Sequence, residues 1–278
     1  MSLDCTVAGH VATITITNPA KRNAMTPAMW EALPPLLDRL AADAGVRLLL
    51  LTGAGGTFCA GADIGALPDL RDADRDLATQ AEQALAAFPK PSVAAIRGYC
   101  VGGGVQLAAA CDLRVAADTA RFGVTPARIG IVYPATALAR LVQLIGPAYA
   151  KTLLFTADLI DARTAHHYGL IEQPVPDPDL DQRVTALTTT LIARSQLTLQ
   201  ATKEIIGTLT GPAIDAAAER HRDWLHEALR SGEAAEGISA FLERRPPAFG
   251  WTGPVSATRQ ATELRQCDLW TGCARTGG

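Results

Sequence analysis

The sequence has few lysines, few aromatic residues and no marked excess of either charge. Only four of its 25 basic residues are lysines, aromatic residues make up 5%, and the formal net charge is −3. This balance gives no electrostatic argument for a nucleic acid or an anionic membrane as a partner. We therefore expect neither.

Cysteine frameworks and targeting patterns are also missing. The six cysteines form no CxxC pair and no Cys/His cluster with zinc spacing, so we expect reduced thiols and no metal site. No uncharged run reaches the roughly 18–20 residues needed to span a bilayer. The first residues have neither the basic nor the apolar region of a secretory signal. These absences favour a soluble, cytoplasmic protein.

What the chain does have is apolar sequence, 48% of 278 residues, in which strand and helix patterns alternate. Thr26 followed by Pro27 is typical of a helix start. Beyond about residue 180 the pattern is almost wholly helical. The alternation predicts the α/β fold class with a C-terminal helical region. The clearest strand patterns are HVATITITN (10–18), VRLLLLTG (46–53) and PSVAAIRG (91–98), and helical patterns lie at 26–43, 77–87 and 103–110.

Two glycine-containing loops, at residues 53–63 and 98–104, each follow an apolar strand. The second opens directly into a helix, where unpaired N–H groups lie at the positive end of the helix dipole. Two such N–H groups facing each other could hold a developing oxyanion. Taken alone, the glycines are more consistent with simple tight turns. Neither GxxxxGK[ST] nor GxGxxG is present, so the loop is not a phosphate site of those types.

Five motifs occur in a fixed order along the chain. They are NPAKRNAM (18–25), LLLLTGAGGTFCAGADI (48–64), KPSVAAIRGYCVGGGVQLAAACDLRVAADTARFG (90–123), RIGI (128–131) and GISAFLERRPPAF (237–249). Together they resemble the enoyl-CoA hydratase/isomerase (crotonase) superfamily over nearly all of residues 1–250.

This resemblance implies an architecture and a ligand. The architecture is a crotonase-like spiral of ββα repeats over residues 1–198, followed by a C-terminal helical oligomerisation region over 199–250. The polar tail, 251–278, falls outside the match. The family pattern also implies a homotrimer or a dimer of trimers. It implies a coenzyme A thioester as substrate or ligand, with no further cofactor.

The resemblance assigns roles to particular residues. It implies an oxyanion hole made by the backbone N–H groups of Ala60 and Gly103. Positions that match coenzyme A contacts of the family are Arg22, near the pantetheine phosphate, Ala62, Asp63 and Ile64, near the adenine, and Arg244 and Phe249, near the nucleotide across a subunit boundary. Each charged member has a simpler alternative: Arg22 as a solvated surface charge, Asp63 as a helix cap, and Arg244 as a charged helix end.

This chain has no acidic residue at the positions where the family pattern has its catalytic acids. Hydration of an enoyl thioester suits two carboxyl groups that face one water. The hydratase pattern places one glutamate two residues after the glycine triplet, where this chain has Gln106, and a second where ungapped alignment gives Pro126. The acid positions of other members fall on Tyr133 and Pro134. Tyr133 could donate a proton or simply pack.

Other groups could replace the missing acids. The acidic stretch at 66–82 matches a variable region that can border the acyl group, although a solvated face is the simpler interpretation. Cys100 is another candidate, with an inert buried thiol as its alternative. Two hypotheses remain. One is an acyl-CoA enzyme, of lyase or isomerase type, that keeps the oxyanion hole without the two-glutamate mechanism. The other is a non-catalytic acyl-CoA-binding or regulatory protein.

Overall fold

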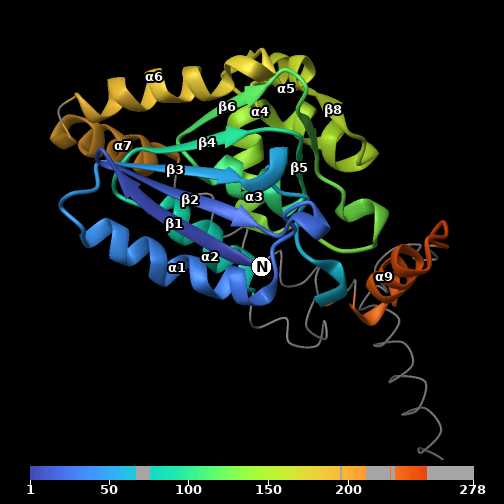
Figure 1. Cartoon of the computed structure of the whole chain (residues 1–278). Helices are drawn as coiled ribbons and strands as arrows, with labels where there is room; N and C mark the ends of the chain where they lie inside the picture. The colour runs from blue at the N-terminus through green and yellow to red at the C-terminus, as the bar shows by residue number, and fades with distance from the viewer. Residues whose placement is uncertain (67–75, 195, 211–225, 227–228, 249–278) are drawn as a thin grey trace, which may run out of the picture.

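The computed structural model describes residues 1–66, 76–194, 196–210, 226 and 229–248 (Figure 1). The strands in these ranges are β1 Ser2–Ala8, β2 Val11–Thr17, β3 Leu48–Gly53, β4 Ser92–Ile96, β5 Tyr99–Val101, β6 Leu113–Ala117, β7 Arg121–Gly123, β8 Ile160–Asp161 and β9 Gln173–Val175. The α-helices are α1 Pro27–Ala42, α2 Leu77–Ala86, α3 Gly103–Ala110, α4 Ala135–Thr156, α5 Ala162–Tyr168, α6 Leu180–Ile192, α7 Gln196–Thr210 and α9 Glu233–Glu243. Short 3-10 turns are η1 Pro19–Lys21, η2 Ala54–Gly56, η3 Ile64–Ala66, η5 Pro126–Arg128 and η6 Asp177–Asp179.

The strands form two sheets. The larger has the order β1-β2-β3-β4-β6-β9, and the smaller has the order β5-β7-β8. In the larger sheet only β1 and β2 are antiparallel, while the remaining pairs are parallel. Strand β1 was not predicted. It is an edge strand whose side chains are mostly exposed, so its sequence carries little of the apolar pattern that reveals a buried strand.

Helices cover both faces of the large sheet (Figure 1). One face packs against α6 through a small core that joins Leu48, Val93 and Val115 to Leu180 and Val184. The other face lies on the main core, which includes residues of α1, α2, α3 and α4. Coverage on both sides explains why every residue of β4 is buried, as the uninterrupted apolar run SVAAI predicts.

Helix boundaries follow local chemistry. Thr26 caps α1 by accepting a hydrogen bond from the N–H of Met29 at 3.3 Å, as predicted. Asp76 caps α2 in the same way, through the N–H of Thr79. The helix α1 continues through Pro34 and Pro35, and the helix α4 is broken where Gly146 adopts a φ of 70°.

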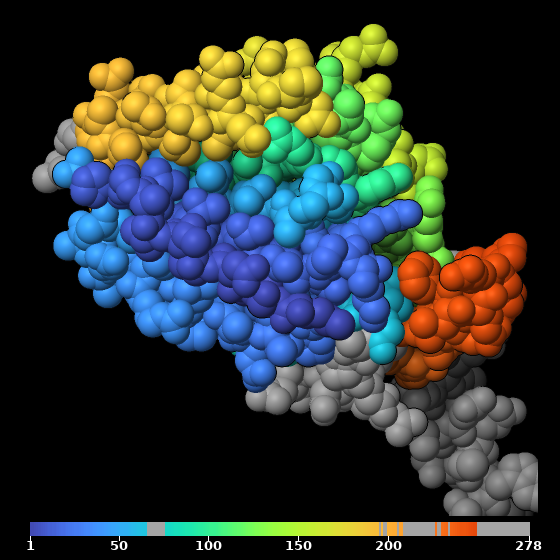
Figure 2. Space-filling model, viewed as in Figure 1, coloured from blue at the N-terminus to red at the C-terminus, as the bar shows by residue number. Residues whose placement is uncertain are grey.

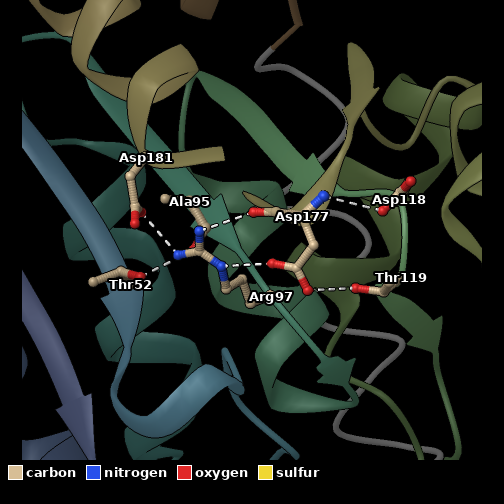
Figure 3. A network of polar contacts seen from close by, with 7 residues as sticks. All are labelled: Thr52, Ala95, Arg97, Asp118, Thr119, Asp177 and Asp181. Carbon is tan, nitrogen blue, oxygen red and sulfur yellow. Dashed lines mark hydrogen bonds and ion pairs between the residues drawn. The ribbon is translucent and has the colours of Figure 1, made fainter. Parts of the chain in front are cut away.

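A charged network fixes the end of β4 to the start of α6 (Figure 3). The guanidinium of Arg97 donates to the carboxylates of Asp177 and Asp181 at 2.8 Å each, and Asp177 also accepts from the hydroxyl of Thr119. Hydrogen bonds from Arg97, which has the larger effect, and from Thr119 lower the pKa of the Asp177 carboxylate. Gly98, the first residue of the second glycine loop, follows Arg97 directly, so this network anchors the strand that leads into the loop.

The C-terminal helix α9 lies at the edge of the molecule, well apart from α6 and α7 (Figures 1 and 2). It crosses the segment after η5 with almost no space between backbones, because a Cβ on Gly237 would lie 1.8 Å from the carbonyl oxygen of Ile129. The motifs RIGI and GISAF therefore meet in space. The regular elements in the described part of 199–250 are all helices, while the polar tail predicted at 251–278 lies outside the described residues.

The architecture confirms the predicted α/β class and its helical C-terminal region. The boundary between a core at 1–198 and a helical region at 199–250 stays a prediction. Among the described helices, none combines the length and apolar character needed to cross a membrane.

Candidate functional site

The two glycine loops come together between β4 and α3. Cys59 pairs with Cys100 in a parallel bridge, and its N–H and C=O exchange hydrogen bonds of 2.9 Å with Tyr99 and Val101. Ala62 pairs with Met25 in a second bridge. Cys59 and Cys100, which are 41 positions apart in sequence, thus lie side by side.

The triplet of Gly102, Gly103 and Gly104 needs glycine for two different reasons. Gly102 has φ 54° and ψ −115°, a conformation that other residues rarely adopt. Gly104 has no room for a side chain, because a Cβ there would lie 2.3 Å from the carbonyl oxygen of Cys59. The triplet therefore presses the start of α3 against the segment that contains Cys59 and Ala62.

This close approach brings two unpaired N–H groups together. A Cβ built on Gly103 would lie 3.4 Å from the nitrogen of Ala62, and 3.0 Å from the ring of Trp30. Among the described residues, neither the Ala62 N–H nor the Gly103 N–H donates to any acceptor. Gly103 is the first residue of α3, where the helix dipole favours negative charge. The arrangement is chemically suited to bind an oxyanion.

The prediction that Ala60 supplies one of these N–H groups is contradicted by its hydrogen bond. The Ala60 N–H donates to the carbonyl oxygen of Arg22 at 3.0 Å, so it is already engaged. That partner is 38 positions earlier in the chain, and the sequence pattern gives no sign of this pairing. Ala62, which sequence comparison placed near the adenine, carries the free N–H instead.

Gln106 and Pro126, which the resemblance placed at the two glutamate positions of the hydratase pattern, are both buried. The Gln106 side chain meets Glu82, whose carboxylate also accepts from Thr136 and pairs with Arg140. The interpretation of residues 66–82 as a solvated face is therefore wrong at Glu82, which is completely buried. Residues 67–75 of that stretch lie outside the described ranges.

Tyr133 packs against the glycine loop. Its hydroxyl donates to the carbonyl oxygen of Gly102 at 2.9 Å. Burial, and then the nearby Glu82 carboxylate, raise the pKa of Tyr133 well above its ordinary value. The side chain thus supports the loop backbone in its neutral form and is a poor base.

The candidate thiol is equally inert. Cys100 is fully buried, and this burial raises its pKa well above the ordinary value. Cys59 beside it has a pKa raised to about 12 by burial. Since the thiolate is the reactive form, neither group is suited to nucleophilic chemistry.

The residues predicted to contact coenzyme A differ in their exposure and in their partners. The Arg22 guanidinium lies over the ring of Tyr99, 4.9 Å from its centroid, and Arg22 is exposed. The Asp63 carboxylate is buried and pairs with Nζ of Lys21 at 2.7 Å, which sequence reasoning missed. It accepts from no backbone N–H among the described residues, so the helix-cap alternative is not supported.

The remaining contacts lie on separate elements. Ile64 begins η3 and is half-buried. Arg244 ends α9 with a φ of 55°, as the charged-helix-end alternative describes, and it is exposed. Phe249 lies outside the described residues. The structure thus brings Arg22 and residues 62–64 to the glycine loops, whereas Arg244 is on the helix at the molecule's edge.

Comparison with known proteins accounts for this arrangement. The sequence model of the enoyl-CoA hydratase/isomerase family matches residues 6–252. The chain belongs to the enoyl-CoA hydratase/isomerase (crotonase) family. This membership confirms the resemblance carried by the five sequence motifs, and members of the family act on acyl-CoA substrates.

Individual crotonase-family relatives cover nearly the whole chain. The 2,3-dehydroadipyl-CoA hydratase of Escherichia coli K12 is 32% identical over 86% of this chain and 95% of its own. A solved enoyl-CoA hydratase/isomerase family member is 38% identical, with a TM-score of 0.72 over 91% of this chain and 97% of its own. A methylmalonyl-CoA decarboxylase solved with 2-nitronate-propionyl-CoA is 26% identical, with a TM-score of 0.82 over 90% of this chain and 98% of its own.

Proposed function

We propose that this protein binds an acyl-CoA thioester and holds its carbonyl oxygen between the N–H groups of Ala62 and Gly103. The observation that carries the proposal is that these two N–H groups lie close together and are unpaired among the described residues. A carbonyl oxygen that becomes an enolate oxyanion gains most from such donors, each worth about 3–4 kcal/mol of barrier. Ala62 replaces Ala60 in this role because the Ala60 N–H is engaged by Arg22.

We further propose that the reaction does not follow the two-glutamate hydration mechanism. The Gln106 amide does not titrate usefully near neutral pH, and Pro126 has no acid–base group. Glu82, the carboxylate bonded to Gln106, already accepts from three donors. An oxyanion hole without an acid–base pair suits lyase or isomerase chemistry that passes through an enolate, which includes isomerisation, decarboxylation and carbon–carbon cleavage. Thioester hydrolysis would use the same hole for a tetrahedral oxyanion.

Steady-state turnover of crotonyl-CoA tests this mechanism. We expect hydration far below the typical enzyme turnover of about 10 s⁻¹. Gly103→Pro removes one N–H at the first position of α3, where proline is compatible with a helix, and Gly103→Ala adds the same Cβ beside Trp30 while keeping the N–H. Hydration at ordinary hydratase rates that is lost in Gly103→Pro but retained in Gln106→Ala would contradict the mechanism, because another acid would then have to exist.

A second candidate function is acyl-CoA binding without catalysis. The observation that favours it is the same full engagement of Glu82, which leaves no open carboxylate beside Gln106. Calorimetry with acyl-CoA, combined with a panel of enoyl, 3-hydroxyacyl and 2-carboxyacyl thioesters, separates the two functions. Binding with no product from any thioester supports the second function, whereas robust turnover of one thioester excludes it.

Self-association as a homotrimer or a dimer of trimers remains our proposal for the assembly. It is supported by large apolar side chains that are exposed at the end of α4 and on α9, where Phe155 is 76% and Leu242 is 58% exposed. Sedimentation velocity of the full chain tests it, and a monomer at micromolar concentration would contradict it. Contacts of Arg22, Asp63, Ile64, Arg244 and Phe249 with coenzyme A, and the cytoplasmic location, stay predictions from the sequence.

A further inference from the structure

Four buried or half-buried polar side chains from three helices meet beside the glycine loop. Glu82 comes from α2, Gln106 from α3, and Thr136 and Arg140 from α4. Glu82 is 0% exposed, and Arg140, whose Nε lies 2.6 Å from Oε1 of Glu82, is 21% exposed. Burying a carboxylate is costly unless it is paired and hydrogen-bonded, and this one is both. These partners therefore fix the position of the carboxylate.

The Glu82 carboxylate determines which end of the Gln106 amide faces it. Oε2 of Glu82 lies 3.0 Å from Nε2 of Gln106 and 2.6 Å from the hydroxyl of Thr136. An ionised carboxylate only accepts hydrogen bonds, so it pairs with the amide nitrogen and repels the amide oxygen. Because Arg140 and Thr136 hold Glu82 in place, the amide of Gln106 cannot flip without losing its partner.

The fixed amide leaves its oxygen available. No described residue donates a hydrogen bond to Oε1 of Gln106. The Gln106 oxygen is not one of the fully sealed, unpartnered side-chain oxygens of the described residues, where Gln196 alone has such an atom, although Gln106 is 97% covered. Gln106 lies three positions after Gly103 on the same face of α3, and helical side chains lean toward the N-terminus. Gln106 therefore extends from the face of α3 that also carries Gly103.

We infer that Glu82 is a positioning residue, which with Arg140 and Thr136 locks Gln106 so that its amide oxygen is a fixed hydrogen-bond acceptor for the acyl group. This inference rests on the proposed function, since it needs a thioester carbonyl at Gly103. Acyl atoms within reach of Gln106 are then those one or two bonds from that carbonyl. A hydroxyl on the β-carbon supplies the donor that the acceptor needs, whereas an unsubstituted acyl chain leaves the acceptor unpaired.

Binding of matched thioesters by calorimetry tests the inference on the full-length protein. The probes are butyryl-CoA and the two enantiomers of 3-hydroxybutyryl-CoA, which differ only in the presence and configuration of the β-hydroxyl. We expect the better-bound enantiomer to bind about fivefold more tightly than butyryl-CoA, the factor that one net hydrogen bond gives. In Glu82→Gln the new amide can donate or accept, so the orientation of Gln106 is no longer fixed. The ratio is then expected to fall below about twofold, with the dissociation constant for butyryl-CoA unchanged.

Further variants separate positioning from a general loss of structure. Gln106→Met removes the acceptor at nearly the same side-chain volume. The ratio of the two dissociation constants, for butyryl-CoA and for 3-hydroxybutyryl-CoA, should then fall to about one. The double variant, Glu82→Gln with Gln106→Met, should show the same ratio as Gln106→Met alone, because Glu82 acts through Gln106. Glu172→Gln removes a carboxylate that pairs with an arginine elsewhere, Arg114, and should leave the ratio unchanged. If Glu82→Gln does not fold, Glu82→Asp retains the charge but withdraws it from the amide, and the ratio should again fall.

The outcomes distinguish this inference from the function on which it rests. If the wild-type protein binds none of the three thioesters, the proposed function and the inference both fail. If it binds all three equally, the inference alone fails. If Glu82→Gln or Glu82→Asp retains the fivefold ratio, or weakens all three thioesters by the same factor, then Glu82 does not position the amide and the inference is overturned.

Discussion

Replacing Gly104 by alanine should disable the site without removing a single polar group. A Cβ at this position would lie 2.3 Å from the carbonyl oxygen of Cys59 and 3.1 Å from its Cβ, whereas ordinary contacts begin at 3.4 Å. The carbonyl belongs to a backbone that pairs with Tyr99 and Val101, so it cannot rotate away as a flexible side chain would. The start of α3 must therefore separate from the Cys59 segment by about 1 Å.

That displacement has two measurable consequences. Overpacking of this kind costs about 1–3 kcal/mol in the free energy of unfolding. It also moves the Gly103 N–H away from the Ala62 N–H, and a misplacement of about 1 Å costs roughly 100-fold in rate for groups that must converge on one atom. Chemical denaturation measures the first effect, and turnover or affinity for the best acyl-CoA found in the thioester panel measures the second.

Gly207→Ala is the matched control for this substitution. Gly207 lies inside α7, and a Cβ there would meet nothing within 4 Å. Alanine should therefore stabilise the protein by about 0.5–1 kcal/mol through helix propensity, with unchanged acyl-CoA binding. If Gly104→Ala behaves like Gly207→Ala, then α3 does not approach Cys59 as described, and the account of the two converging loops is refuted.

Three smaller predictions concern the frame around the site. Thr26→Ala removes the cap of α1 and should lower the free energy of unfolding by about 1 kcal/mol in chemical denaturation, whereas Thr26→Ser should preserve most of it. Arg97→Gln breaks a half-exposed network and should cost about 1 kcal/mol or less, an effect that weakens with added salt; a salt-independent loss would point to packing instead. Iodoacetamide at pH 8, followed by peptide mapping, should label the exposed Cys5 but not Cys59, whose burial raises its pKa to about 12, and rapid labelling of Cys59 in the native protein would contradict its burial.

The sequence predicts much of the fold because buried elements leave a clear pattern. The uninterrupted run of β4, the Thr26-Pro27 start of α1 and the glycine triplet before α3 all follow from local chemistry, and each is found where it was expected. The edge strand β1 leaves no such pattern and was missed.

The site was harder to predict because it depends on backbone pairing and on Glu82, a buried acid in a stretch that was interpreted as a solvated face. Whether Ala60 or Ala62 offers a free N–H is decided by the carbonyl of Arg22, whose pairing has no signature in residue types. Glu82 was misread because its stretch is acidic. Yet it lies three positions before the apolar Leu85, on the same face of the predicted helix, which was the available signal that its carboxylate faces inward.

The most direct test of the central claim is the infrared spectrum of bound butyryl-CoA labelled with carbon-13 at the thioester carbonyl. Hydrogen bonds from the N–H groups of Ala62 and Gly103 weaken the carbonyl double bond. We therefore predict that its stretching band moves to lower frequency than in water, and that part of this shift is lost in Gly103→Pro. A bound thioester whose carbonyl band stays at its aqueous frequency would contradict the account.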